Sequence, residues 1–403
     1  MRLFSGRPGI WLAAAGVATG IMPARAIQPS DVLAYSIGPL MVRPQFDITE
    51  TFNSNLFYRP DHEIGDFITG ISPGIHLYLG KPEHNLISLN YQFERLIHAD
   101  QSQLDGNNHA FTIQTQLQGP HWLLSGQDKI QLLSNRVLGA ELNFVQSLVD
   151  YNMYSDNYRL TYNLGEKTSV YLAGAFDAID YEKGTSVLDY NNLAVTTGFA
   201  YAALPKTTFF GEIYYGQTAT DPNMPTMPKY AHSDFLGGFL GAKGDFTAKV
   251  SAQLKVGYES RQFSDNTPSD GNLVVAASLD YRYSEKSSAT LSAVRRSGVS
   301  VQSGNAAYVL NNVSVQLKQA IGSRDKWMAS LTASYDAYNY QGNVFANRTD
   351  TLYRVSVGLN YLVQVWLTAG VGYELDKFKT NGTSSGISDY DVHLVTVKLA
   401  VGY

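Results

Sequence analysis

Residues 393–403 read HLVTVKLAVGY, and their side chains alternate between two kinds. The apolar face consists of Val395, Val397, Leu399, Val401 and Tyr403. A period of two predicts a strand with one apolar face. Because an exposed apolar strand end pairs readily with other chains, we expect this terminus to be buried or paired. Two structures satisfy that requirement: the last strand of a soluble sandwich, or the closing strand of an outer-membrane β-barrel.

The start of the chain has the parts of a secretory signal peptide. Arg2 and Arg7 precede an apolar run that ends at Met22, and a small-residue cleavage site follows. We expect cleavage after Ala26, so that residues 1–26 are a signal peptide and are removed. The alternative is a membrane-anchoring helix, for which the apolar run is short. The sequence contains no cysteine, so neither disulfides nor a lipid-modified cysteine is involved.

The composition favours short amphipathic strands. After Ala26, no stretch reaches the roughly 18 uninterrupted apolar residues that a membrane helix needs. The chain nevertheless has 27 Tyr, 18 Phe and 35 Gly, and only 16% of its residues are charged. Without the three arginines of the signal peptide, 27 basic residues remain against 35 acidic ones, a net charge of −8. A nucleic-acid partner would need a basic surface, so we expect none.

Alternation between apolar and polar residues recurs along the whole chain. Its clearest example is AKVSAQLKVGYESR at residues 248–261, and residues 87–94 and 353–361 repeat it. None of these stretches has the 3.6-residue period of a helix. One face would suit lipid and the other water, which predicts an all-β fold of transmembrane strands.

The connections between these strands alternate in length. Short turns include GKPEH at 80–84, GEKT at 165–168 and LPKT at 204–207, whereas residues 99–107 and 218–230 are long and polar. Outer-membrane barrels have tight turns at the periplasmic rim and long loops at the outer rim. A soluble sandwich has no reason to sort its loops in this way, so the pattern favours the barrel.

Counting the segments between turns predicts about eighteen strands. We expect them to form a transmembrane antiparallel up-and-down β-barrel over residues 40–403, in the bacterial outer membrane. An even count returns both ends of the chain to the periplasm. Residues 27–39 do not alternate clearly and are interpreted as a periplasmic lead-in. Pro73 interrupts the ladder of the second strand and predicts a bulge there.

The end of the chain also resembles the signal that the barrel-assembly machinery reads, in which an aromatic terminal residue follows alternating apolar positions. The corresponding residues are Val397, Leu399, Val401 and Tyr403. Further aromatic residues are expected at lipid-facing strand ends, at the level of the lipid headgroups. These are Tyr281, Tyr283, Tyr335, Tyr361 and Tyr373.

Residues 43–94 carry a second resemblance. They contain the Asn-rich segment TFNSNL at 51–56 and the segment DFITGISPGI at 66–75, followed by Tyr91. On these motifs the chain resembles the beta-barrel porin family found in bacterial exopolysaccharide gene clusters, and YNLGEKT at 162–168 is a weaker match. The resemblance implies a pore through which a growing polysaccharide crosses the outer membrane, together with a periplasmic polysaccharide export protein.

A pore is also the function that the strand count predicts, because barrels of about 16–18 strands leave an aqueous channel. The charged residues expected to line this lumen are Lys249, Lys255, Glu259, Arg261, Asp280, Arg282, Arg296, Lys318, Asp336, Arg354, Glu374 and Asp376. Both signs are present, whereas a phosphate-selective pore would need a dominant basic ring. Mixed polar walls suit a neutral or weakly charged glycan.

Other functions stay open at this point. A general diffusion porin for small sugars or solutes would share the architecture, and the long loops could serve adhesion. An outer-membrane hydrolase needs Ser, His and carboxylate side chains together, and the local cluster to consider is His98 and His109 with Asp100 and Asp105. No metal motif such as HExxH occurs. We therefore expect no enzymatic activity and no cofactor.

Overall fold

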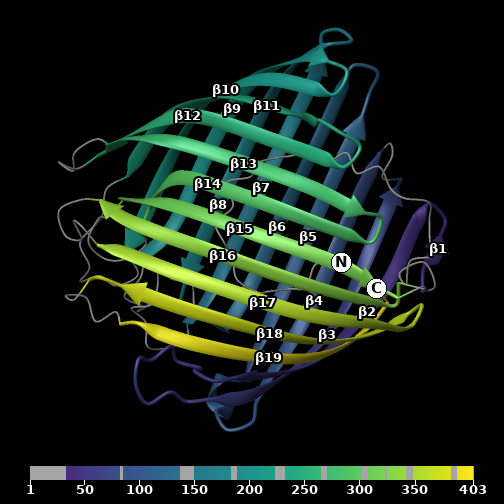
Figure 1. Ribbon diagram of the computed structural model, residues 1–403, viewed down its shortest axis with the longest axis vertical. Coiled ribbons are helices and arrows are strands. Elements are labelled where there is room, and N and C mark those ends of the chain that lie inside the picture. The colour runs from purple at the N-terminus through teal and green to yellow at the C-terminus, as the bar shows by residue number, and fades with distance from the viewer. Residues whose placement is uncertain are drawn as a thin grey trace.

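The computed structural model describes residues 33–81, 85–136, 149–182, 188–222, 232–264, 270–300, 307–322, 325–341, 348–382 and 388–402. These residues form a closed antiparallel β-barrel of eighteen strands, β2 to β19, preceded by a short strand, β1 (Figure 1). The strand number predicted from the sequence is confirmed. No helix in the described residues is long and apolar enough to cross a membrane.

The strands up to β10 are β1 (Tyr35–Ile37), β2 (Leu40–Asn53), β3 (Asp66–Gly80), β4 (Leu86–His98), β5 (Gly106–Gln118), β6 (Trp122–Arg136), β7 (Val149–Asn163), β8 (Thr168–Tyr181), β9 (Leu188–Leu204) and β10 (Thr207–Pro222). The others are β11 (Ser233–Asp245), β12 (Val250–Phe263), β13 (Asp270–Ser284), β14 (Ser287–Val299), β15 (Ala307–Ile321), β16 (Trp327–Gln341), β17 (Thr349–Gln364), β18 (Leu367–Thr380) and β19 (Tyr390–Val401). A short 3-10 helix, η1 (Ser102–Leu104), lies between β4 and β5.

Each barrel strand pairs with its neighbours in sequence, and β19 closes the barrel against β2. The closing register begins at Leu394 opposite Asn53. Across this seam the side-chain oxygens of Thr51 and Thr396 lie 3.0 Å apart. Because lipid offers no hydrogen-bond partner to a bare strand edge, this closure is what lets the sheet span a membrane.

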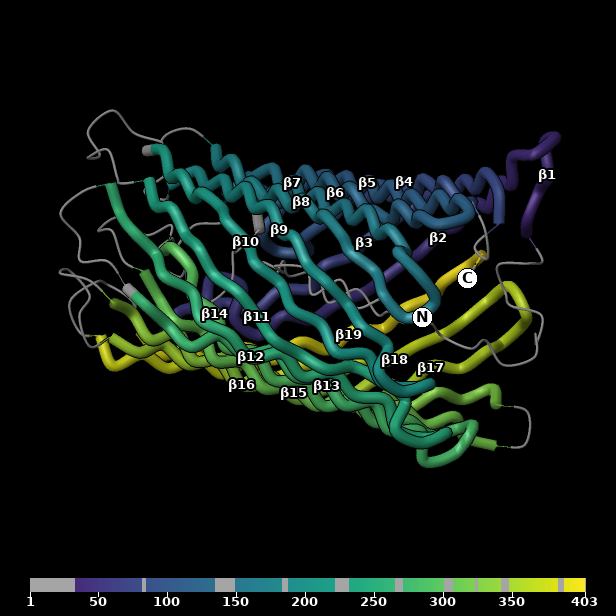
Figure 2. The backbone as a smooth tube through the Cα atoms, turned by 90° about the horizontal axis from the view of Figure 1, so that it is seen from above, coloured from purple at the N-terminus to yellow at the C-terminus, as the bar shows by residue number. Residues whose placement is uncertain are grey.

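Short turns and long connections lie at opposite rims of the barrel. The turn from β3 to β4 lies at one rim, and so does every second connection after it, up to the turn from β17 to β18. The first residue of β2 and the last residue of β19 lie at the same rim. Figure 2 shows β1 and the end of β19 at the right, at this turn rim. By the rule for outer-membrane barrels, the turn rim is periplasmic and the opposite rim is outer.

The outer face of the barrel carries large apolar side chains. On β12, Leu254, Val256 and Tyr258 are exposed, whereas the alternate residues Lys255 and Glu259 are half-buried or buried. Aromatic pairs mark both ends of this apolar band. Examples are Trp327 against Tyr361 near the turn rim, with ring centroids 4.4 Å apart, and Tyr335 against Tyr353 farther toward the outer rim, with ring centroids 5.1 Å apart. The five tyrosines expected at lipid-facing ends all lie on this face.

The outer face has one acidic pair within its apolar band. Asp128 of β6 lies opposite Asp156 of β7, on the same face as Leu124 and Ile130. The hydroxyl of Tyr158 donates a hydrogen bond of 2.5 Å to Asp128. The two carboxyl groups and the Tyr158 hydroxyl thus form one polar patch on the outer face.

On the inner face, aromatic rings lie flat over glycines of the adjacent strand. Such pairs on β8 to β11 are Tyr171 over Gly198, Tyr214 over Gly237, Phe235 over Gly216 and Phe210 over Gly241. A Cβ atom at Gly198 would lie 2.1 Å from Cζ of Tyr171. Because glycine has no side chain, the ring can rest against the backbone. These rings therefore lie along the inner wall and do not project across the lumen.

Two local features differ from the sequence prediction. The bulge expected at Pro73 is wrong, because the pairs Ile71–Arg95 and Gly74–Gln92 flank it in one continuous register. Because Pro73 has no backbone N–H group, the strand lacks one donor at this position, and the proline ring lies on the exposed face.

The second difference is β1, a strand that the sequence does not predict within residues 27–39. The chain turns after β1 at Gly38, whose φ of 59° suits glycine, and Ile37 of β1 pairs with Leu40 of β2.

Residues 1–32 and Tyr403 lie outside the described residues, so signal cleavage after Ala26 and the role of Tyr403 in assembly stay predictions.

The two faces of β17 should respond in opposite ways to a new cation. Val357 is exposed on the outer face, and the adjacent Ser356 lies on the inner face opposite Glu374. We expect Val357→Arg to lower the free energy of unfolding in lipid vesicles by about 2–4 kcal/mol, as cations facing lipid do. Ser356→Arg should change it little. Equal losses measured by denaturant titration would show that the faces are assigned wrongly.

The glycines beneath the rings should be intolerant of side chains. Gly198→Val would force Tyr171 off the wall, so we expect a loss of about 1–3 kcal/mol in unfolding free energy, typical of overpacking. Gly174 lies on the outer face of β8, where an added Cβ atom would meet no neighbour within 4 Å, and Gly174→Val is the matched control. If the control variant destabilised the protein as much as Gly198→Val, the contact between the Tyr171 ring and the backbone at Gly198 would not be the cause of the loss.

Candidate functional site

The inner face of the barrel is identified by side chains that meet across two strands. Tyr171 of β8 donates a hydrogen bond of 2.6 Å to Glu212 of β10, and Gln45 of β2 donates one of 2.9 Å to Asn90 of β4. Next-nearest strands are about 9.5 Å apart in a sheet, so such contacts require side chains that converge. Convergence occurs on the concave side of a barrel. The polar face of the strands is therefore the wall of the lumen.

Eleven of the twelve charged residues expected in the lumen lie in strands on this inner face. They are Lys255, Glu259, Arg261, Asp280, Arg282, Arg296, Lys318, Asp336, Arg354, Glu374 and Asp376. Lys249 is the exception. It is exposed in the turn before β12, and its Nζ donates a hydrogen bond of 3.0 Å to the carbonyl oxygen of Tyr283. The turn that precedes β12 places Lys249 at the turn rim, outside the strands that form the wall of the lumen.

One group of these charges lies on the wall formed by β16, β17 and β18. Nε of Arg354 is 2.9 Å from Oδ1 of the fully buried Asp376 and 3.8 Å from Oε1 of Glu374. Asp336 accepts a hydrogen bond of 2.6 Å from Nδ2 of Asn312. Three carboxylates therefore surround one guanidinium group, and this wall is locally acidic.

Arg296 of β14 connects this wall electrostatically to the opposite side. It interacts with Asp336, two strands away, and also with Asp177 of β8, six strands away. Asp177 in turn accepts a hydrogen bond of 2.7 Å from Ser155. Charged side chains from both sides thus approach one another inside the barrel.

A second group lies on β10, β11 and β12. The buried Arg261 donates hydrogen bonds to Ser233 (2.9 Å), Thr218 (3.1 Å) and Glu259 (3.2 Å). Tyr214 donates a hydrogen bond of 3.1 Å to the other oxygen of Glu259. Charge-assisted bonds from several strands hold this buried pair in one geometry.

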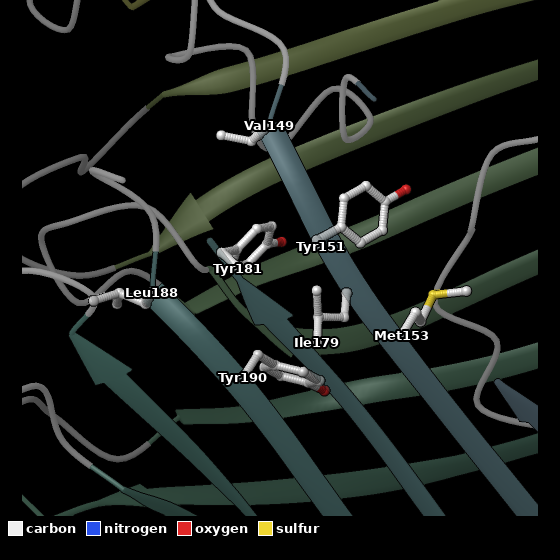
Figure 3. Packing of buried hydrophobic residues seen from close by; sticks show 7 residues of the cluster. All are labelled: Val149, Tyr151, Met153, Ile179, Tyr181, Leu188 and Tyr190. Atoms are coloured by element: carbon white, nitrogen blue, oxygen red, sulfur yellow. The ribbon is translucent and has the colours of Figure 1, made fainter. Parts of the chain in front are cut away.

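Apolar clusters line the outer end of the lumen, and two of them lie on opposite walls. Figure 3 shows one of them, on β7, β8 and β9, made of Val149, Tyr151, Met153, Ile179, Tyr181, Leu188 and Tyr190. The other lies on β17, β18 and β19 and contains Leu352, Phe378, Tyr390 and Val392. Since β8 and β17 are nine strands apart in a barrel of eighteen, the clusters face each other.

The connection between β2 and β3 adds Tyr58 to the second cluster. Its ring packs edge-on against Tyr390, with centroids 5.0 Å apart. Asn55 fixes the start of this connection, because its Nδ2 donates to the carbonyl oxygens of Arg59 (2.7 Å) and Asp391 (3.2 Å). This part of the Asn-rich motif therefore has a structural role at the outer mouth.

Sequence reasoning missed other charged residues of the inner wall. Asp47 and Lys398 form an ion pair of 2.9 Å across the closing seam, and the alternation in residues 393–403 already places Lys398 on the polar face. It also missed Arg159, Glu212 and Lys243, whose strands alternate less regularly. The same alternating pattern could have found them once the strand positions were known.

The proposed cluster of histidines is not brought together. His98 ends β4 on the inner face, with Nδ1 3.6 Å from Oδ1 of Asp105. His109 lies on the outer face of β5, with Nδ1 3.1 Å from the hydroxyl oxygen of Tyr91. Among the residues that the structure describes, no three His, Cys, Asp or Glu side chains are grouped to hold a metal ion.

The sequence model of the family described as "Putative beta-barrel porin 2" matches residues 188–403, more than half of the chain. This match lies beyond residues 43–94, so it does not rest on the motifs noted there. No curated protein sequence matches the chain.

The solved structures that are similar to this chain have very low sequence identity to it. The outer membrane protein OpdK from Pseudomonas aeruginosa is 8% identical, with 89% of this chain and 98% of that chain covered and a TM-score of 0.47. The FrpB iron transporter from Neisseria meningitidis is 11% identical, with 90% and 65% covered and a TM-score of 0.49. OccAB4 from Acinetobacter baumannii is 10% identical, with 89% and 97% covered and a TM-score of 0.45.

The family match and the closed eighteen-stranded barrel agree with each other. The chain belongs to the family described as "Putative beta-barrel porin 2", and its described residues form the closed β-barrel that this description names.

Proposed function

We propose that this barrel is an exit pore for an exopolysaccharide. The resemblance at residues 43–94 supports this substrate class, and an eighteen-stranded barrel is wide enough for an aqueous channel. The observation that carries the proposal is the chemistry of the inner wall, which combines hydrogen-bonding groups with aromatic rings.

Sugars present hydroxyl groups at their edges and C–H groups on their faces, so a path for them needs both polar and flat apolar surface. The inner wall offers amides and hydroxyls such as Gln45, Asn90 and Ser292. It also offers half-buried rings, among them Tyr214 and Phe239, which stack with centroids 5.4 Å apart. A general diffusion porin needs no such rings along its wall.

The proposed function includes no catalytic step. The two histidines considered for a hydrolase from the sequence, His98 and His109, lie on opposite faces of the sheet and do not form one cluster. The proposal also includes secretion by the predicted signal peptide, and recognition of Val397, Leu399, Val401 and Tyr403 by the barrel-assembly machinery. Neither step depends on a cofactor.

The proposed periplasmic export partner would meet the turn rim. There β1 projects beyond the barrel (Figures 1 and 2), with Tyr35 and Ile37 exposed by 59% and 67%. It pairs with β2 along one edge, and an extended edge can accept a strand from another chain. We propose this hairpin as the contact surface for the export protein.

Narrowing the lumen should have the same effect on polymer display as deleting the gene. Ala175 of β8 and Ser356 of β17 lie on opposite inner walls, nine strands apart. In a strain that makes polymer, the double variant Ala175→Trp with Ser356→Trp should abolish polymer display on the cell surface while precursors are still made. Surface polymer is measured with a labelled lectin on intact cells.

The matched control places the same side chains on the outer face, as Leu172→Trp with Val357→Trp, and should leave surface polymer at the wild-type level. Both variants must show the heat-dependent gel mobility of a folded barrel. Normal surface polymer in a narrowed, folded barrel would contradict the proposal. If uptake of small sugars fell at the same time, the result would instead support a general diffusion porin for small sugars or solutes.

A further inference from the structure

Three cations gather around one carboxylate on the inner wall near the periplasmic rim. Arg159 of β7, Lys243 of β11 and Lys255 of β12 lie five residues or fewer from the turn ends of their strands. Glu212, the carboxylate, lies five residues into β10 from the same rim. The group is therefore positioned where a polymer coming from the periplasm would first enter the barrel.

The carboxylate of Glu212 is already engaged on both oxygens. Tyr171 donates a hydrogen bond of 2.6 Å to Oε1, and Nζ of Lys255 lies 3.4 Å from Oε2. Lys243 interacts electrostatically with Glu212 and also with Arg159, a group of like charge. The four ionised groups sum to a charge of +2, which leaves this part of the wall locally positive.

Aromatic rings hold two of the cations in place. The guanidinium carbon of Arg159 lies 3.5 Å from the centroid of the Tyr171 ring, and Nζ of Lys255 lies 4.4 Å from that of Phe239. Tyr171 itself rests on Gly198, so glycine, ring and cation form successive layers from the backbone toward the lumen. Cation–π contacts of this kind fix charged groups that would otherwise move freely. The site is therefore preorganised before any ligand arrives.

We propose that Arg159, Lys243 and Lys255 form an anion-binding site, and that its ligand is the carboxylate of an acidic sugar unit in the exported polymer. This substrate class rests on the proposed function. It differs from the neutral or weakly charged glycan that the overall charge pattern suits, because the excess of cations is local to β7, β11 and β12.

The composition of the site favours a sugar acid over a small inorganic anion. A half-buried group of like charges gains most from a ligand that brings negative charge. Glu212 can accept hydrogen bonds from the several hydroxyl groups of a sugar, whereas a small inorganic anion offers few O–H groups or none. Phe239 supplies apolar surface beside the cations for the C–H groups of the ring. The acidic wall around Arg354 would repel the same ligand and keep it on the basic side.

Block of ion current by defined oligosaccharides tests the site directly. Purified full-length protein in a planar bilayer would be titrated from the turn-rim side with trigalacturonic acid, with maltotriose and with inorganic phosphate. We expect trigalacturonic acid to block at a concentration about tenfold below either of the others. Equal block by maltotriose would overturn the proposal, and equal block by phosphate would show a site for small anions only.

The variant Arg159→Gln with Lys243→Gln should raise the half-blocking concentration of trigalacturonic acid about tenfold. Lys318→Gln removes a cation at similar depth on β15, outside the proposed anion-binding site. This variant should change the half-blocking concentration less than twofold. Unchanged block in the double variant would also overturn the site. If that variant does not insert, the comparison of the three ligands on the wild-type protein still decides the question.

Failure of the anion site and failure of the export function give different results. The bilayer measurement reports binding in the purified pore, whatever passes through it in the cell. Surface polymer in the narrowed barrel reports export, whatever charge the polymer has. Export without selective block by trigalacturonic acid would leave an exit pore for a neutral glycan.

Discussion

The whole structure depends on satisfying every backbone N–H and C=O group of the sheet inside a lipid bilayer. Hydrocarbon offers these groups no partner, so a sheet can cross only when its first and last strands pair. Here β19 pairs with β2, and the seam continues through side chains at Thr51 and Thr396 and at Asp47 and Lys398. The apolar alternation that runs to the end of the chain is the sequence counterpart of this requirement.

Closure gives the sheet one convex and one concave face, and this distinction explains most of the lumen. Convex side chains diverge toward lipid, so they need only be apolar. Concave side chains converge, and residues two strands apart then bond, as Tyr171 and Glu212 do. Glycines in the intervening strands let aromatic rings lie flat beneath the charged groups. The same curvature that closes the barrel therefore assembles its ion pairs.

Sequence reasoning reached the features that depend on local pattern. Strand number, turn positions and the facing of residues such as Lys255 and Arg354 follow from alternation alone. Features that depend on neighbours were out of reach: Pro73 keeps its register because the strands on both sides hold it, and Lys249 lies in a turn because β12 begins one residue later. The positive group around Glu212 comes from four strands spread between β7 and β12, and no stretch of sequence shows that proximity.

The closing seam can be tested most directly with a disulfide, because the chain has no cysteine of its own. Thr51→Cys with Thr396→Cys places two thiols on the inner face of β2 and β19, where the native oxygens are 3.0 Å apart. We expect an intramolecular disulfide in the membrane-inserted protein under mild oxidation, and none between Thr51→Cys and Ser292→Cys of β14. Failure of the first pair to cross-link in a folded barrel, or cross-links only between molecules, would contradict the closure.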